Sequence, residues 1–516
     1  MNMNKTYISE NREKVLITIV LLFSLSIPLI MFRGSIDDFV PKHIVVIDQI
    51  INNGYMAEDY YTSQIPGFYI IGAMLTLITS IDLSILAFTP IQIIPYGLIL
   101  FILMYKISGN YLISGLIVLI DLISGTTGTP KIFYWPHGLG TILFYTSLIV
   151  LINILQISRD NAMGKYTLLI IISSALVFMS YDLTCYYLIF IAIAIMLIFS
   201  FFLLNNDKIE KNKYLQLFKN LSTLFLIIVV ILFGLSKFIY NTFIPMLKSL
   251  AVEVSVIEKF IMSYFFPKTI DTHLQYLCIS YPFSITIISA IKYLLLLVSI
   301  ILFMYMIVKI YMARKKLNAS ECIVLSIIIT ALFYAASRYL IGQIPVTVLY
   351  FPGILCTLWL INKRKKWSYT VVILLLLLTP LYYYIFYNND FLNNDTSMYA
   401  NVEIATEWFM QKSSQDYILK SDEMTKNLLL LNSSLNDSGY NLEQYQSMTS
   451  VDAVNLIQGS DMLPERYYYA INYKLSTMSL ENWIIIKSWR FCKDKINENR
   501  SVNKNYDSSG IAIYMT

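Results

Sequence analysis

The chain has 516 residues, of which 57% are hydrophobic and only 14% are charged, and its formal net charge is +5. Soluble domains carry about 25% charged residues, so this composition excludes a soluble globular fold for most of the chain. Repeated apolar runs of about 20 residues predict membrane-spanning helices instead. The five cysteines are scattered and form no Cys-x-x-Cys pair, so they indicate neither a disulfide framework nor a metal site.

The apolar runs predict an all-α polytopic membrane protein with about 11 transmembrane helices. Short loops rich in Lys and Arg face the cytoplasm, and placing the basic loops inside gives a consistent path for the chain. The N-terminus is then cytoplasmic, and the first apolar run is an uncleaved span. The predicted spans cover residues 15–32, 85–105, 111–124, 138–156, 166–180, 184–204, 221–240, 281–311, 322–336, 344–361 and 368–387.

One apolar run, Pro66 to Ser80, has only about 15 residues and is shorter than a span needs. If it crossed the membrane, every later basic loop would lie outside. We therefore expect it to lie in the outer interface as a juxtamembrane helix, with the helix-period segment 43–52 beside it. Both segments belong to a first outer loop over residues 33–84, within a transmembrane domain over residues 1–387.

From residue 388 to residue 516 the composition turns soluble, with about 11 basic and about 16 acidic residues. A net negative tail on a positive chain agrees with an extracytoplasmic position for the tail. Its patterns predict a small α/β domain. The expected elements are a helix over 402–411, buried strands over 416–421 and 482–487, and a closing hairpin over 503–516.

Unusual polar residues collect in the loops predicted to be outside. Each has an ordinary explanation, because adjacent aspartates form solvated loops, an Arg at a span end snorkels, and Tyr and Trp form interfacial belts. Several loops contribute such residues to one face, whereas the inner face is only basic, and this favours a functional site. The residues are Asp37, Asp38, His43, Tyr60, Tyr61, Gln64, Lys131, Tyr134, Trp135, His137, Asp182 and Arg338.

Four of these features resemble the GT-C class of integral-membrane glycosyltransferases, which includes protein O-mannosyltransferases and lipid A aminoarabinose transferases. They are the pair Asp37-Asp38, the stretch "QIPG" that begins at Gln64, the loop "FYWPHG" around Trp135, and Arg338 in "SRYLIGQIP". Many relatives carry Asp-Glu at the first position and Lys or His at the position of Gln64. The oligosaccharyltransferase motif Trp-Trp-Asp-Tyr-Gly is absent.

The resemblance implies a transferase that takes a sugar from a polyprenyl- or dolichyl-phosphate donor. The plasma membrane is the location expected by default. The acceptor would be a glycan, a lipid or a protein outside the cell. Asp37, with Asp38 second, would be the catalytic base. Arg338, assisted by Lys131 or His137, would hold the donor phosphate.

The remaining outer residues would contact substrate: His43, Tyr60, Tyr61, Gln64, Trp135 and Asp182. A divalent cation such as Mg²⁺ or Mn²⁺ is left open, with Asp37 and Asp182 as candidate oxygen ligands. The spacing of these carboxylates has no fixed metal signature.

Two other interpretations stay open. A lipid-carrier flippase or transporter would place charged or broken helices near the membrane midplane and carry internal repeats. A non-catalytic relative would be retained for its C-terminal domain. No nucleotide-binding motif occurs, and the basic residues lie in inner loops rather than in a patch, so nucleic acid is not expected as a partner.

Overall fold

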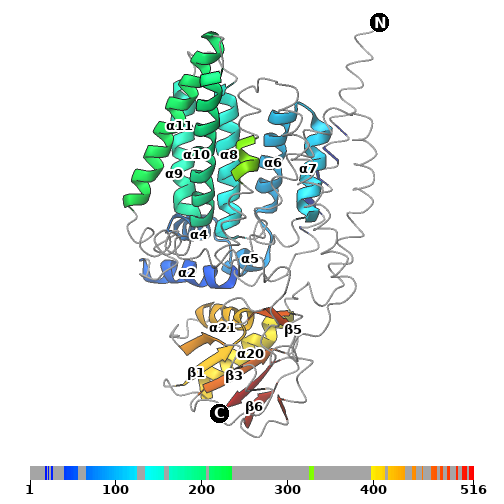
Figure 1. Ribbon diagram of the computed structural model, residues 1–516. Coiled ribbons are helices and arrows are strands. Elements are labelled where there is room, and N and C mark those ends of the chain that lie inside the picture. The colour runs from blue at the N-terminus through cyan, green and yellow to red at the C-terminus, as the bar shows by residue number, and fades with distance from the viewer. Residues whose placement is uncertain are drawn as a thin grey trace, which may run out of the picture.

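The computed structural model describes the chain in two main parts, residues 40–234 and 397–515, each with short gaps. It also describes residues 325–330 and single helical positions between 15 and 29. The described chain is mostly helical and carries a small sheet near its C-terminus (Figure 1). This confirms the predicted class at that level. The predicted spans 281–311, 344–361 and 368–387 lie outside the described residues.

The first part is built from helices alone in its described residues. In chain order they are α2 (Val40–Asn53), α4 (Pro66–Thr79), α5 (Leu83–Phe88), α6 (Ile93–Ser108), α7 (Tyr111–Ser124), α8 (Pro136–Leu155), α9 (Ala162–Met179), α10 (Tyr181–Leu204) and α11 (Lys208–Gly234).

Helices α7 to α10, α2 and α4 agree with their predicted runs to within a few residues at each end, whereas two other runs differ. The run 85–105 is not one helix, because Pro90 separates α5 from α6. A residue before proline avoids the helical region, and Thr89 is accordingly extended. The basic stretch 208–219 was expected in a loop but forms the first turns of α11. There Tyr214 and Leu217 are buried, and Lys211 lies over the ring of Phe202.

Two described helices are long and apolar enough to cross a membrane, over Pro136–Ile154 and Tyr214–Leu232. Four shorter apolar helices accompany them: Pro66–Thr79, Ile93–Ser108, Gly164–Met179 and Tyr186–Ser200. The helices α6 and α8 to α11 stand side by side, while α2, α4 and α5 lie at one end of this bundle, next to the C-terminal part (Figure 1).

Helix α4 contains no charged residue and has two different faces. Phe68, Tyr69, Gly72 and Ala73 are buried, and α4 packs against α2 and α9. The other face is an apolar stripe that is between 40% and 75% exposed, formed by Ile70, Ile71, Met74, Leu77 and Ile78. A stripe with helical spacing and no charge suits contact with the apolar part of a membrane interface.

The C-terminal part combines two helices with a five-stranded sheet. The sheet order is β2-β1-β3-β7-β6; β1 is parallel to both β2 and β3, and β7 is antiparallel to β3 and β6. The elements are α20 (Ser397–Lys412), β1 (Ile418–Ser421), α21 (Glu423–Leu435), β2 (Tyr445–Ser447), β3 (Tyr467–Asn472), β6 (Asn503–Asp507) and β7 (Ile511–Met515).

The predicted α/β pattern of the tail is confirmed for the helix, the first strand and the closing hairpin. Aromatic packing holds α20 on the sheet, since the ring of Phe409 lies 5.5 Å from that of Tyr468 and 6.0 Å from that of Tyr445. The segment 482–487 does contain a strand, β5 (Ile485–Lys487). It pairs with β4 (Thr477–Ser479) in a separate two-stranded sheet rather than in the main one.

Helix α2 joins the two parts of the fold. It packs against α4 and α5 on the bundle side and against α21 on the C-terminal side (Figure 1). The first nine residues of α2 are accordingly buried or half-buried, including the polar side chains of His43 and Asp48. The helix is therefore an internal layer at the boundary between the bundle and the sheet.

Candidate functional site

The candidate site is centred on His43 in the first turns of α2. Trp135 Nε1–H donates a 2.8 Å hydrogen bond to His43 Nε2, and His43 Nδ1 lies 2.8 Å from the hydroxyl oxygen of Tyr69. The His43 ring also packs edge-on against Phe68, with 5.6 Å between the ring centroids. One imidazole therefore ties α2 to α4 and to the residue that precedes α8.

These contacts define the protonation of His43. Its Nε2 accepts a hydrogen bond and so carries no proton, which places the proton of the neutral ring on Nδ1, where it is donated to Tyr69. Burial lowers the pKa of His43 well below its usual value, and electrostatic interaction with Lys42 and His137 lowers it further. His43 is thus a neutral residue that orients Trp135.

A third hydrogen bond extends the site toward α10. His137 is the second residue of α8, and its Nδ1 lies 3.0 Å from Ser180 Oγ. Ser180 immediately precedes α10 and accepts a hydrogen bond from the backbone N–H of Leu183, as an N-cap serine does. The rings of Trp135 and His137 meet edge to face with centroids 4.7 Å apart, which joins the two halves of the site.

Four helices begin at this site. His43 and Tyr69 are each the fourth residue of their helices, Trp135 directly precedes α8, and Ser180 directly precedes α10. A helix N-terminus carries about half a positive charge and presents unpaired N–H groups. The N-termini of α2, α4, α8 and α10 therefore make this end of the bundle favourable for a negatively charged group.

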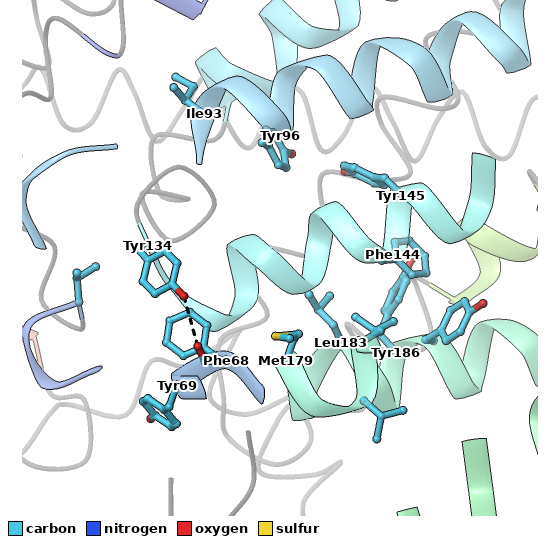
Figure 2. Close-up of a cluster of buried hydrophobic side chains, with 14 of the residues drawn as sticks. Phe68, Tyr69, Ile93, Tyr96, Tyr134, Phe144, Tyr145, Met179, Leu183 and Tyr186 are labelled. Atoms are coloured by element: carbon cyan, nitrogen blue, oxygen red, sulfur yellow. Dashed lines mark hydrogen bonds between the residues drawn. The ribbon is translucent and has the colours of Figure 1, made fainter. Parts of the chain in front are cut away.

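Glycines allow these helices to approach one another closely. A Cβ on Gly72 would lie 2.5 Å from Ile47 Cδ1 and 3.0 Å from the Tyr134 hydroxyl. A Cβ on Gly67 would lie 2.8 Å from Phe178 Cβ. The Tyr134 hydroxyl donates to the carbonyl of Phe68 at 3.3 Å, and the two rings stack beside it (Figure 2). The backbones around His43 are thus held by close packing as well as by hydrogen bonds.

The structure brings together three of the predicted site residues and places a fourth on a helix that begins there. His43, Trp135 and His137 form one connected group, and Asp182 is the second residue of α10. Tyr134 is also described and lies beside this group through its contact with Phe68. The other seven residues lie outside the described ones: Asp37, Asp38, Tyr60, Tyr61, Gln64, Lys131 and Arg338. In sequence, Asp37 and Asp38 precede the first residue of α2 by three and two positions.

Sequence reasoning missed Tyr69 and Ser180. The serine had a detectable signal, because Ser followed by Asp two residues later at the start of an apolar run is typical of a helix N-terminus. Tyr69 had none, since a tyrosine within an apolar helix has the same pattern whether or not its hydroxyl is used. Its pairing with His43 spans 26 residues of sequence and follows from how α2 and α4 pack.

No group of three or more His, Cys, Asp or Glu side chains that could hold a metal ion occurs within the part of the chain that the structure describes. The described groups are hydrogen-bonding and aromatic ones: two imidazoles, an indole, a phenol and a hydroxyl. Together with the helix N-termini, they suit recognition of an anionic head group flanked by an apolar or sugar-like moiety.

The fold and this site describe a class: an apolar helical bundle with a polar, aromatic cluster at one end, where a small α/β part also lies (Figure 1). No family model matches the chain, and no curated protein matches it either.

Proposed function

We propose that this chain is a plasma-membrane glycosyltransferase of about 11 spans that uses a polyprenyl- or dolichyl-phosphate sugar. One observation carries the proposal, which is that four helix N-termini converge on His43, Trp135 and His137. Such an arrangement favours the phosphate of a lipid-borne donor. The uncharged, exposed stripe of α4 beside it suits the interface where that lipid lies.

In the proposed reaction, the acceptor hydroxyl attacks the anomeric carbon of the donor. The bond between that carbon and the phosphate oxygen breaks, and its electron pair leaves with the phosphate. Asp37, with Asp38 beside it, takes the proton of the attacking hydroxyl. The acidic pair precedes the N-terminus of α2 in sequence, and this supports its assignment to the same site.

Donor binding is assigned to Arg338, with Lys131 and His137 in support, because a guanidinium meets a phosphate through two hydrogen bonds. Contacts with the sugar and the acceptor are assigned to Tyr60, Tyr61, Gln64, Trp135 and Asp182. His43 acts on the substrate indirectly, by positioning Trp135, since its two ring nitrogens are already hydrogen-bonded to Tyr69 and Trp135. We propose that the C-terminal α/β part lies outside the cell and over this site.

Native mass spectrometry of the purified chain tests donor binding. We expect wild type to bind polyprenyl-phosphate hexose and Arg338→Ala to bind it about 10- to 100-fold more weakly, because a charge-assisted hydrogen bond is lost. Arg314→Ala removes an arginine from a predicted inner loop and should leave binding unchanged. A folded wild-type chain that binds no such lipid would contradict the proposal.

A second variant tests the chemistry. Asp37→Asn should retain donor binding in the same assay and lose transfer to any acceptor that wild type uses, because the amide cannot accept a proton. Retained turnover in Asp37→Asn would remove Asp37 from the role of base.

A further inference from the structure

Gln92 immediately precedes α6, and the residue is only 4% exposed. Neither its Nε2 nor its Oε1 has a hydrogen-bond partner among the described residues. The side chain does not cap α6 either, although the residue occupies the N-cap position. Burying an amide without partners costs free energy, so such a residue calls for an explanation.

Gln92 lies at the end of the bundle where the candidate site is found. Helix α5, which ends four residues before Gln92, packs against α2. Helix α6 packs against α8, and the rings of Tyr96 and Tyr145 lie 5.9 Å apart across that contact. Ile93, the first residue of α6, and Tyr134, which precedes α8, mark the beginnings of these two packed helices (Figure 2). Gln92 therefore lies where α6 begins, four residues after the helix that packs against α2.

The chemistry of the amide limits what can satisfy it. Nε2 offers donors and Oε1 offers acceptors, so a matching ligand must both accept and donate. An ionised phosphate only accepts and would leave Oε1 unpaired. A hydroxyl group both donates and accepts.

We propose that the Gln92 side chain binds hydroxyl groups of a carbohydrate at the N-terminal end of α6. This rests on the proposed function, which supplies a substrate that carries a sugar. It assigns sugar recognition to α6, whereas the phosphate faces the N-termini around His43. An ordered water could satisfy the same two atoms, and the experiment distinguishes the two.

The first measurement uses the unliganded full chain. Gln92→Met keeps the length of the side chain and removes both unpaired polar atoms, so we expect the Tm to rise by about 1–4 °C. Gln49→Met is the matched control, since Gln49 has an interaction partner and its replacement should not raise the Tm. A fall in the Tm of Gln92→Met would show that a water already satisfies the amide, and it would overturn the proposal.

The second measurement compares the rise in Tm caused by polyprenyl phosphate, polyprenyl-phosphate hexose and free hexose. In wild type we expect the sugar-bearing lipid to raise the Tm more than polyprenyl phosphate alone. In Gln92→Met we expect this sugar-dependent increment to disappear while the effect of polyprenyl phosphate remains. An increment that survives in Gln92→Met would overturn the proposal.

The two proposals fail in different ways. If neither lipid affects wild type but free hexose raises its Tm in a manner that requires Gln92, the proposed function fails and the sugar site stands. If both lipids raise the Tm of wild type equally and free hexose does not raise it, the sugar site fails while a phosphate-binding site stands.

Discussion

His43 is the residue on which the described site depends most. Its ring fills a buried position, and each of its nitrogens has a defined partner on a different element. Because a charged imidazolium would be desolvated there and would lose its acceptor for Trp135, the neutral form is favoured. The geometry of Trp135, and through it that of His137, depends on His43 remaining neutral.

A pH dependence of stability follows from the lowered pKa of His43. Below about pH 6.5 the unfolded state binds a proton that the folded state does not bind, so stability falls as the pH falls. We expect wild type to lose up to about 1.4 kcal/mol per pH unit from this group below pH 6.5. His43→Gln can still donate and accept but does not titrate, and its Tm between pH 7.5 and 5 should decline less steeply. Equal slopes for the two proteins would show that His43 is not held neutral.

At the scale of elements, the site depends on how closely α8 approaches the turn between α9 and α10. Gly140 faces that turn, and a Cβ there would lie 2.8 Å from both Ser180 Cβ and Leu183 Cδ1. Ser180 is the hydrogen-bond partner of His137, and His137 lies about one turn before Gly140 in α8. The glycine therefore sets the distance at which the hydrogen bond between His137 and Ser180 can form.

Gly140→Ala should destabilise the fold by about 1–3 kcal/mol through overpacking. Gly164→Ala in α9 is the matched control, because a Cβ at that position would have no described atom within 4 Å and alanine favours helix by roughly 0.5–1 kcal/mol. Thermal unfolding of both variants checks the sign, with Gly140→Ala below wild type and Gly164→Ala at or above it. A stable Gly140→Ala variant would mean that α8 and α10 are less closely packed than described.

For the whole molecule, α2 connects the bundle with the C-terminal part. His43 and Ile47 face α4, and Val45 lies about 160–200° away from them around the helix. Val45 is buried, and α21 packs against α2. A change in how α21 docks therefore acts on the helix that carries His43.

Two adjacent valines test this connection. Val45→Ala should weaken the docking of α21 and increase hydrogen exchange of the amides of Glu423–Leu435, because it leaves a cavity at a buried contact. Val46→Ala makes the same chemical change at a half-buried position and should have the smaller effect. Equal exchange in the two variants would indicate that α21 does not depend on α2.

The agreement between sequence and structure differs from one kind of element to another. Long apolar runs such as α8 and α10 were predicted within a few residues, since hydrophobic length is a local property. The sequence analysis did not predict the break at Pro90 or the extension of α11 through its basic turns. Packing decided the extension of α11, because Tyr214 and Leu217 are buried among its charged residues. The burial of Gln92 without a described partner was also beyond local reasoning.

The sequence by itself determined which segments are apolar, which ends are polar and that the tail has an α/β pattern, because these depend on composition and on spacing along the chain. Only the tertiary structure decided that the polar positions of α2, α8 and α10 meet. His43 and Trp135 are separated by 92 residues, and His137 and Ser180 by 43. Contacts of that range arise from helix packing, where close approach at Gly72 and Gly140 sets which N-termini come together.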